Sequence, residues 1–77
     1  MEDATFKTSD MYFAAFLRVA GVKFIEAIRD SGGRVHFTFE NGDSIRELKR
    51  EYFNRSGKVG ALDYADEVRS MKSLVHQ

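Results

Sequence analysis

The feature that most constrains the fold of this chain is a short segment in which apolar and polar residues alternate. Within Arg34–Glu40 every second residue is apolar, at Val35, Phe37 and Phe39. A period of two is typical of a β-strand with one buried face and one solvated face. Because Gly32-Gly33 precedes this segment and Val22–Arg29 is rich in apolar residues, the sequence predicts a β-hairpin.

The length of the hairpin loop decides which side chains of the first strand reach the core. A loop of two or four residues places Glu26 opposite Phe37, on the core face. A loop of three residues pairs Ala27 with Phe37 and Ile25 with Phe39, because a slip of one residue reverses the facing of a strand. Burying an unpaired carboxylate costs several kcal/mol, which exceeds the roughly 1.5–3 kcal/mol lost by exposing one large apolar side chain. The three-residue loop is therefore preferred.

This register leaves an apolar patch on the outer face of the hairpin. A patch of this kind needs to be covered, either by another element of the same fold or by a partner. The third helix or the N-terminal strand is the simpler cover, and a second copy of the chain or another protein is the alternative. The candidate interface residues are Val22, Phe24, Ile28, His36 and Thr38.

Local signals before the hairpin predict one strand and one helix. Thr5–Thr8 is a candidate third strand of the sheet, because an isolated hairpin is only marginally stable in water. A first helix follows Thr8-Ser9-Asp10, whose side chains can accept hydrogen bonds from its first-turn amides. Gly21 stands where a glycine commonly ends a helix.

Two further helices are predicted after the hairpin. Ser44 and Glu47 match a capping box for a helix over Ile45–Asn54. Asp63 is the expected N-cap of a last helix that ends near Val75. The expected order is strand, helix, strand, strand, helix, helix. We expect an α+β fold, a small antiparallel sheet packed against three helices, in a single domain over residues 1–77.

Composition narrows the class of protein. The chain has no cysteine and only two histidines, so disulfides and thiolate metal sites are excluded. Twelve basic and twelve acidic residues give a formal net charge of zero, which argues against nucleic-acid binding through bulk charge. No apolar run approaches the length of a membrane span, and the acidic N-terminus does not resemble a signal peptide. We therefore expect a cytoplasmic protein that uses no metal or cofactor and contacts no membrane.

No arrangement of residues in the sequence points to catalysis. His36 lies on the polar side of its strand, where an exposed histidine without a chemical role is more common than a general base. His76 suits the negative end of the last helix. Asp63, Asp66 and Glu67 could hold a hard cation, but the helix dipole explains carboxylates in a first turn without one. We expect a protein that is not an enzyme.

One local charge bias stands out in this neutral chain. Residues 46–58 carry five basic side chains against two acidic ones, which gives a local charge of +3. Tyr52 and Phe53 are interleaved among them, as in some nucleic-acid binders, although their helical spacing also suits core positions. The candidate nucleic-acid contacts are Arg46, Lys49, Arg50, Arg55 and Lys58.

Several segments together resemble a small family of bacterial and phage-associated proteins, the DUF5659-like domains of unknown function. These segments are Thr8-Ser9-Asp10, Ala14-Ala15-Phe16-Leu17, Gly21, Val35–Glu40, Tyr52-Phe53-Asn54 and Lys72-Ser73-Leu74-Val75. The resemblance spans nearly the whole chain and implies a small intracellular domain, with no activity or catalytic residue to carry over. It also places a lysine at Lys72, whose ammonium group can reach solvent or a partner's carboxylate or phosphate.

Two functions are consistent with these observations. The first is a protein-interaction module without enzymatic activity, which associates with another protein or with itself through the hairpin sheet. The second is a nucleic-acid-binding domain that uses the basic edge of residues 46–58. The sequence favours the first, because the aromatic-rich core carries no chemical constellation.

Overall fold

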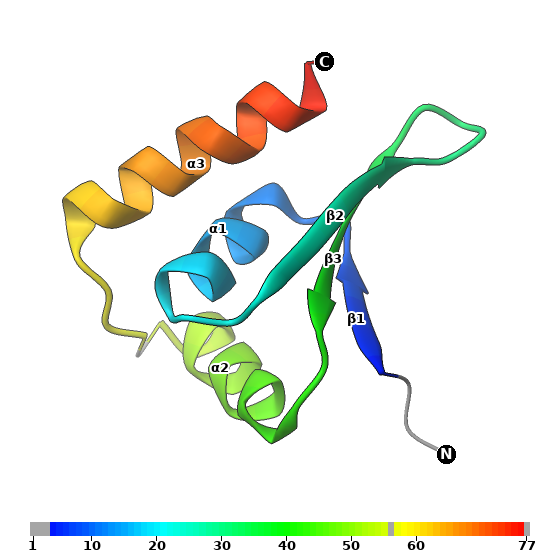
Figure 1. The fold of residues 1–77 in the computed structure, drawn as a ribbon. Coiled ribbons are helices and arrows are strands. Elements are labelled where there is room, and N and C mark those ends of the chain that lie inside the picture. The colour runs from blue at the N-terminus through cyan, green and yellow to red at the C-terminus, as the bar shows by residue number, and fades with distance from the viewer. Residues whose placement is uncertain (1–3, 56, 77) are drawn as a thin grey trace.

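A three-stranded antiparallel sheet with helices on one side forms the fold (Figure 1). The computed structural model describes residues 4–55 and 57–76. Its elements in chain order are β1 (Thr5–Thr8), α1 (Met11–Val19), β2 (Phe24–Arg29), β3 (Val35–Glu40), α2 (Asp43–Phe53) and α3 (Ala61–Val75). β3 is the central strand, between β1 and β2. The predicted α+β fold and its element order, including the N-terminal strand, are confirmed.

Helix α1 begins and ends where the sequence places its signals. The Asp10 carboxylate accepts hydrogen bonds from the backbone amides of Tyr12 and Phe13, at 3.0 and 3.1 Å, and so satisfies two first-turn donors. Gly21 has a φ of +94°, and its amide donates to the Arg18 carbonyl at 3.1 Å. A glycine in this conformation ends the helix without steric cost.

The hairpin turn is closed by Asp30 and Gly33. The Gly33 amide donates to the Asp30 carbonyl at 3.0 Å, and the Asp30 amide donates to the Arg34 carbonyl at 2.8 Å. Asp30 Oδ1 also accepts from the amides of Gly32 and Arg34, at 2.9 and 3.0 Å. Gly33 has a φ of +87°, the left-handed conformation that the last position of a three-residue hairpin loop requires. The predicted loop length is confirmed.

The register expected from that loop is correct next to the turn and wrong farther from it. Ala27 pairs with Phe37, as expected, but a β-bulge follows at Ile25, so that Phe24 lies opposite Phe39. The two phenylalanine rings meet edge to face, with centroids 5.4 Å apart. An extra residue in one strand restores the facing of the side chains beyond it. The bulge therefore turns the large ring toward the core while the acidic residue of the same strand stays exposed.

Helices α2 and α3 both begin earlier than predicted. Gly42 and Gly60 are their N-caps, and neither forms a side-chain cap hydrogen bond. The capping box of Ser44 and Glu47 and the N-cap assigned to Asp63 are therefore wrong. A hydroxyl or carboxylate is also favourable inside a first turn, and the sequence pattern does not separate that position from the cap. No helix in the described residues is both long and apolar enough to cross a membrane.

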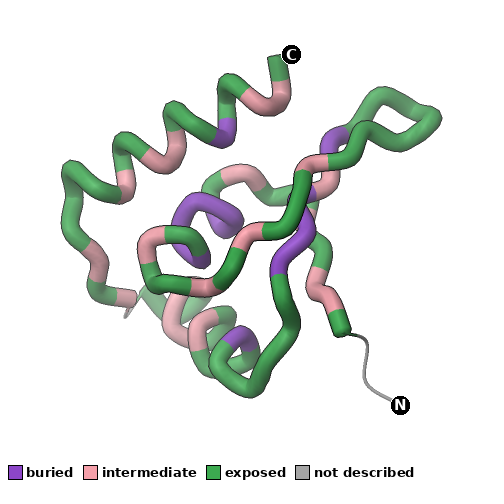
Figure 2. Tube along the Cα trace, viewed as in Figure 1, coloured by how far each residue is buried: buried purple, intermediate pink, exposed green. Residues whose placement is uncertain are grey.

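Buried residues of α1 and β3 meet in one core (Figure 2). The largest fully buried side chains are Phe37, Phe39, Leu17 and Met71. Met71 belongs to α3, and the buried Ile45 belongs to α2, so both later helices close over this core. Each such side chain contributes roughly 1.5–3 kcal/mol on burial. A chain of 77 residues without cysteine depends on these contacts for its stability.

The turn geometry predicts unequal effects for substitutions at its two glycines. Gly33→Ala places an L side chain at positive φ and should lower the free energy of unfolding by about 1–2 kcal/mol. Gly32→Ala is the matched control, because Gly32 does not have a positive φ and an added Cβ would lie 3.4 Å from Asp30 Oδ1. Urea denaturation followed by circular dichroism measures both variants. Equal losses at the two positions would contradict the assigned turn.

Candidate functional site

Three basic side chains share one exposed face of α2. Arg46, Lys49 and Arg50 stand at spacings i, i+3 and i+4, which align on one side of a helix, and all three are exposed. We call these three residues the basic stripe. Phe53 follows at i+7 on the same side of the helix, and its side chain is also exposed.

The acidic residues of α2 are only partly separated from the basic stripe, because Asp43 borders the same groove as Arg46 and Lys49. They repeat at every fourth position, as Asp43, Glu47 and Glu51. Arg50 and Glu47 meet where the two sides adjoin, with 3.9 Å between Nη1 and Oε2, and such an exposed pair contributes little to stability. Arg46 and Lys49 form no ion pair with any residue that the structure describes. The helix is neutral in sum, and its charges are only partly separated between two sides.

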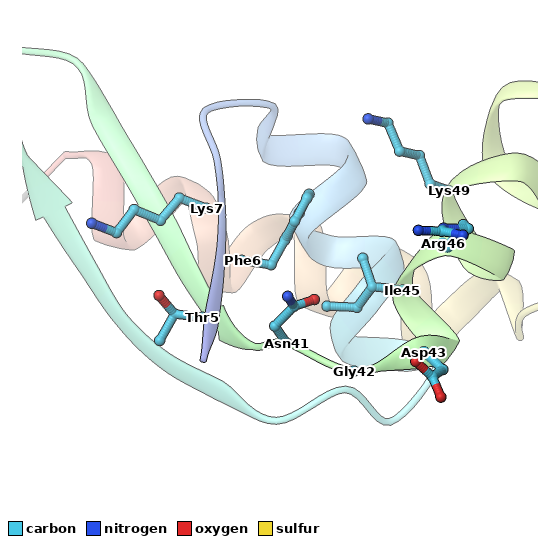
Figure 3. A pocket seen from close by; sticks show the side chains of 9 residues that line it. All are labelled: Thr5, Phe6, Lys7, Asn41, Gly42, Asp43, Ile45, Arg46 and Lys49. Atoms are coloured by element: carbon cyan, nitrogen blue, oxygen red, sulfur yellow. The ribbon is translucent and has the colours of Figure 1, made fainter. Parts of the chain in front are cut away.

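An open groove of about 680 Å³ lies between β1 and the amino end of α2 (Figure 3). Phe6 and Ile45 contribute its apolar part, and Arg46 and Lys49 extend from α2 on the side that faces β1. Lys7 also borders this groove, but Figure 3 shows its side chain pointing away from α2. Two members of the basic stripe, Arg46 and Lys49, therefore supply positive charge to the groove, and Asp43 supplies one carboxylate.

Arg55 and Lys58 lie outside the basic stripe. Arg55 has a φ of 58°, which turns the chain out of α2, and it lines a separate pocket of about 200 Å³ with Tyr52 and Tyr64. Lys58 is exposed in the connection between α2 and α3. The structure thus brings together three of the five predicted nucleic-acid contacts and places two elsewhere.

Phe53 differs from its expected place in the core. The apolar face of α2 consists of Ile45, Leu48 and Tyr52, which pack in or against the core, whereas Phe53 retains 62% of its accessible surface. The position of Phe53 on the helix distinguishes it from the apolar face, because Phe53 follows the exposed Lys49 by one turn. The ring belongs to the charged side of the helix and not to its apolar side.

The hydroxyl groups of Tyr52 and Tyr64 remain protonated at neutral pH. Burial raises the pKa of Tyr52 to about 12, and the charge of Asp10 and the Tyr64 phenol add to this effect. Burial also raises the pKa of Tyr64, and its hydroxyl donates to the Tyr12 carbonyl at 3.2 Å. The Tyr64 phenol joins α3 to α1 as a hydrogen-bond donor, and a phenol with a raised pKa is a weaker acid, so few phenolate ions are present to act as a base at neutral pH.

The candidate interface on the hairpin is smaller than predicted. Val22 and Phe24 pack against the core because of the bulge, and their assignment to the outer face is wrong. Ile28 keeps 43% and Ile25 keeps 45% of its accessible surface. β1 joins the sheet at its edge, beside β3, and the helices lie on the other face (Figure 1). The expected cover by the N-terminal strand or the third helix is therefore not observed among the described residues.

Thr38 and His36 lie on the outer face of β3 but differ in their surroundings. Thr38 is 2% exposed between Lys7 and Glu26, and its hydroxyl has no hydrogen-bond partner among the described residues. His36 Nε2 lies 2.8 Å from Asp30 Oδ2, which ties the strand to the turn. His36 is therefore engaged in a structural contact within the hairpin.

Two of the three acidic residues of α3, Asp66 and Glu67, form ion pairs. Glu67 Oε2 lies 3.1 Å from Arg18 Nε, and Asp66 Oδ1 lies 3.4 Å from Arg69 Nη2. The Arg18 guanidinium also stacks over the Phe24 ring, 5.2 Å from its centroid. Within residues 4–55 and 57–76, no three potential metal ligands lie together.

A family model matches almost the whole chain. The family model of a domain of unknown function, DUF5659, matches residues 3–77. No curated protein and no solved structure matches the chain significantly. The match covers nearly the whole sequence and brings no assigned activity, so the surface chemistry described above is the basis for a functional proposal.

The Asp30 contacts predict acid-sensitive stability. The His36 hydrogen bond, followed by the Arg34 and Gly32 amides, holds the pKa of Asp30 below its ordinary value of 3.8. A lowered pKa in the folded state means that the stabilisation is present above the unfolded pKa and is lost as the pH falls through the folded pKa. Asp30→Asn keeps an oxygen acceptor for the two amides but removes the charge. Its unfolding free energy should fall below that of the parent protein near neutral pH, and the difference should vanish in acid below the folded pKa.

Urea unfolding at several pH values measures this difference. In a His36→Gln background the pH-dependent part should be smaller, because the largest cause of the lowered pKa is removed. A difference between the parent protein and Asp30→Asn that stays constant with pH would refute the assignment.

Proposed function

Because the chain belongs to the DUF5659 family of domains of unknown function, we propose a function from its surface, namely binding to the phosphate backbone of a nucleic acid through α2. The observation that carries the proposal is the basic stripe. Arg46 and Lys49 form no ion pair with described residues and border an open groove. Exposed cations without a protein partner are available to phosphate oxygens.

The separation of charge on α2 explains how a neutral protein can bind a polyanion. A phosphate beside Arg46 and Lys49 is close to two cations that form no ion pair with described residues, although Asp43 borders the same groove. At an ionic strength of about 0.1 M, charges interact over roughly 10 Å, so nearby carboxylates such as Glu47, 3.9 Å from Arg50, reduce the attraction. This supports binding that is weak and strongly dependent on salt.

The dimensions of the stripe support a short contact. An α-helix rises about 1.5 Å per residue, so residues 46–53 span roughly 10 Å. That length accommodates about three phosphates of one strand at the 3.4 Å spacing per nucleotide of B-form DNA. An intracellular location, where nucleic acid is accessible, is part of the proposal.

Charge reversal on the stripe tests this function. Arg46→Glu combined with Lys49→Glu should weaken the binding of a fluorescein-labelled DNA of about 20 nucleotides at least tenfold at low salt, because two phosphate contacts become repulsive. For the parent protein, log Kobs should fall with log salt at a slope of about −2 to −3, as expected for three cations. Fluorescence anisotropy measures both quantities.

The control is Lys23→Glu with Arg69→Glu, at two positions outside α2. It makes the same change of net charge, and both residues are exposed. This control should bind like the parent protein. Loss of affinity to the same extent in both double variants, or no binding by the parent protein at low salt, would argue against the proposal.

Self-association is a second candidate function, favoured by the uncovered outer face of the sheet. Ile25 and Ile28 of β2 are nearly half exposed, and β2 lies at an edge of the sheet. Val22 and Phe24 pack against the core, so the apolar patch on the outer face is smaller than predicted. Self-association therefore ranks behind nucleic-acid binding.

Light scattering coupled to size exclusion tests self-association at several protein concentrations. If the outer face pairs, the parent protein should show a dimer at high concentration, and Ile28→Lys should shift it to monomer by placing a charge in the contact. Leu62→Lys is the control, because Leu62 is 82% exposed on α3 and lies outside the sheet. A strict monomer at the highest concentration removes this candidate.

A further inference from the structure

We infer that Phe53 is a stacking platform for a base, and that the nucleic acid bound by α2 is therefore single-stranded. This inference rests on the proposed function and adds the substrate class to it. A single exposed apolar residue is common on protein surfaces. Phe53 is distinguished by two independent observations, its rigid support and its position on the basic stripe.

The ring of Phe53 is held from one side by other aromatic rings. Its centroid lies 6.0 Å from that of Phe13, which is 2% exposed, and 5.3 Å from that of Tyr52. The Tyr52 ring is itself 5.0 Å from Phe13 and 5.4 Å from Phe16. A ring that rests on this cluster and still keeps 62% of its accessible surface presents a fixed apolar surface to solvent, and stacking on it requires little loss of side-chain freedom.

The end of α2 is also fixed, which keeps the ring in place. The Asn54 amide donates to the Arg50 carbonyl at 3.0 Å, and the Arg55 amide donates to the Tyr52 carbonyl at 3.2 Å. Arg55 then takes the left-handed conformation, which ends the helix and turns the chain away. Phe53 therefore lies in a well-defined last turn and not on a frayed end.

The position of Phe53 relative to the cations matches the chemistry of a nucleotide. It follows Lys49 by four residues and Arg50 by three, so ring and cations lie on one side within a single helical turn. A strand whose phosphates contact the two cations can place an adjacent base on the ring. Aromatic rings bind unpaired bases in this way and cannot reach the faces of bases that are stacked within a duplex. The combination selects single strands, whereas cations alone would bind both forms.

Two substitutions at position 53 separate stacking from other roles of the ring. Phe53→Leu keeps apolar contact with Phe13 and Tyr52 but has no aromatic face. It should weaken binding to single-stranded oligothymidylate by roughly 5- to 100-fold and leave binding to a duplex of the same length unchanged. Phe53→Trp should retain the single-strand affinity. The chain has no tryptophan of its own, so the fluorescence of Phe53→Trp reports on position 53 alone. This fluorescence should be quenched by oligothymidylate and not by inorganic polyphosphate.

Tyr12→Leu is the control for loss of an exposed aromatic ring, because Tyr12 is 49% exposed on α1 and lies outside the basic stripe. It should bind single strands like the parent protein. Urea unfolding of Phe53→Leu confirms that the variant is folded before binding is measured.

The outcomes separate this inference from the proposed function. If Phe53→Leu binds single strands as tightly as the parent protein while Arg46→Glu with Lys49→Glu does not, the stacking role is overturned and backbone binding stands. If the parent protein binds single strands and duplexes with equal affinity, the stacking role of Phe53 is also overturned and backbone binding stands. If the parent protein binds neither form at low salt, both proposals fail.

Discussion

The packing of the Phe13 ring is the contact on which the arrangement of the candidate site depends. This one buried side chain of α1 meets Phe6 of β1 at 6.1 Å between centroids, and Tyr52 and Phe53 of α2 at 5.0 and 6.0 Å. Each such aromatic pair contributes about 0.5–1.5 kcal/mol beyond its buried area. The ring therefore fixes the separation of β1 and α2, and with it the groove between them and the direction of the basic stripe.

The distribution of charge bears more on function than the total charge does. A net charge of zero describes the field far from the molecule, where screening by salt already removes most of it. A ligand in contact with α2 experiences the local field instead. Arg46, Lys49 and Arg50 cluster on one side of this helix, so the local field there is more positive than the zero sum of the helix suggests, although Asp43 borders the same groove.

The β-bulge at Ile25 decides which residues of the hairpin are available for contact. A uniform register forces either Glu26 inward or Phe24 outward, and one extra residue removes that conflict. The consequence is functional as well as structural. The outer face of the sheet keeps only two half-exposed isoleucines, while the ring of Phe24 joins Phe39 and supports the Arg18 guanidinium.

The sequence by itself determined the features that depend on near neighbours in the chain. The alternation of Val35–Glu40, the capping segment Thr8-Ser9-Asp10, the glycine at position 21 and the three-residue turn are all set by local geometry and are predicted by the sequence, although the sequence does not single out Asp10 as the cap. The element order and the α+β class follow from these signals. The clustering of basic residues near α2 was also visible, since their helical spacing is a property of the sequence alone.

Only the tertiary structure decided the features that depend on residues far apart in the chain. The bulge arises because a uniform register cannot place Phe24 in the core and Glu26 in solvent at the same time. Phe53 contacts Phe13 on one side only, and the rest of its ring stays exposed. The N-caps Gly42 and Gly60 lie where the chain leaves β3 and where it leaves the connection between α2 and α3. The sequence pattern alone does not distinguish an N-cap from a residue inside the first turn of a helix, as at Ser44 and Asp63. It also does not distinguish a helix residue at the border of the core, such as Phe53, from one within the core. Packing between distant residues resolves both, because it sets which surface is removed from water.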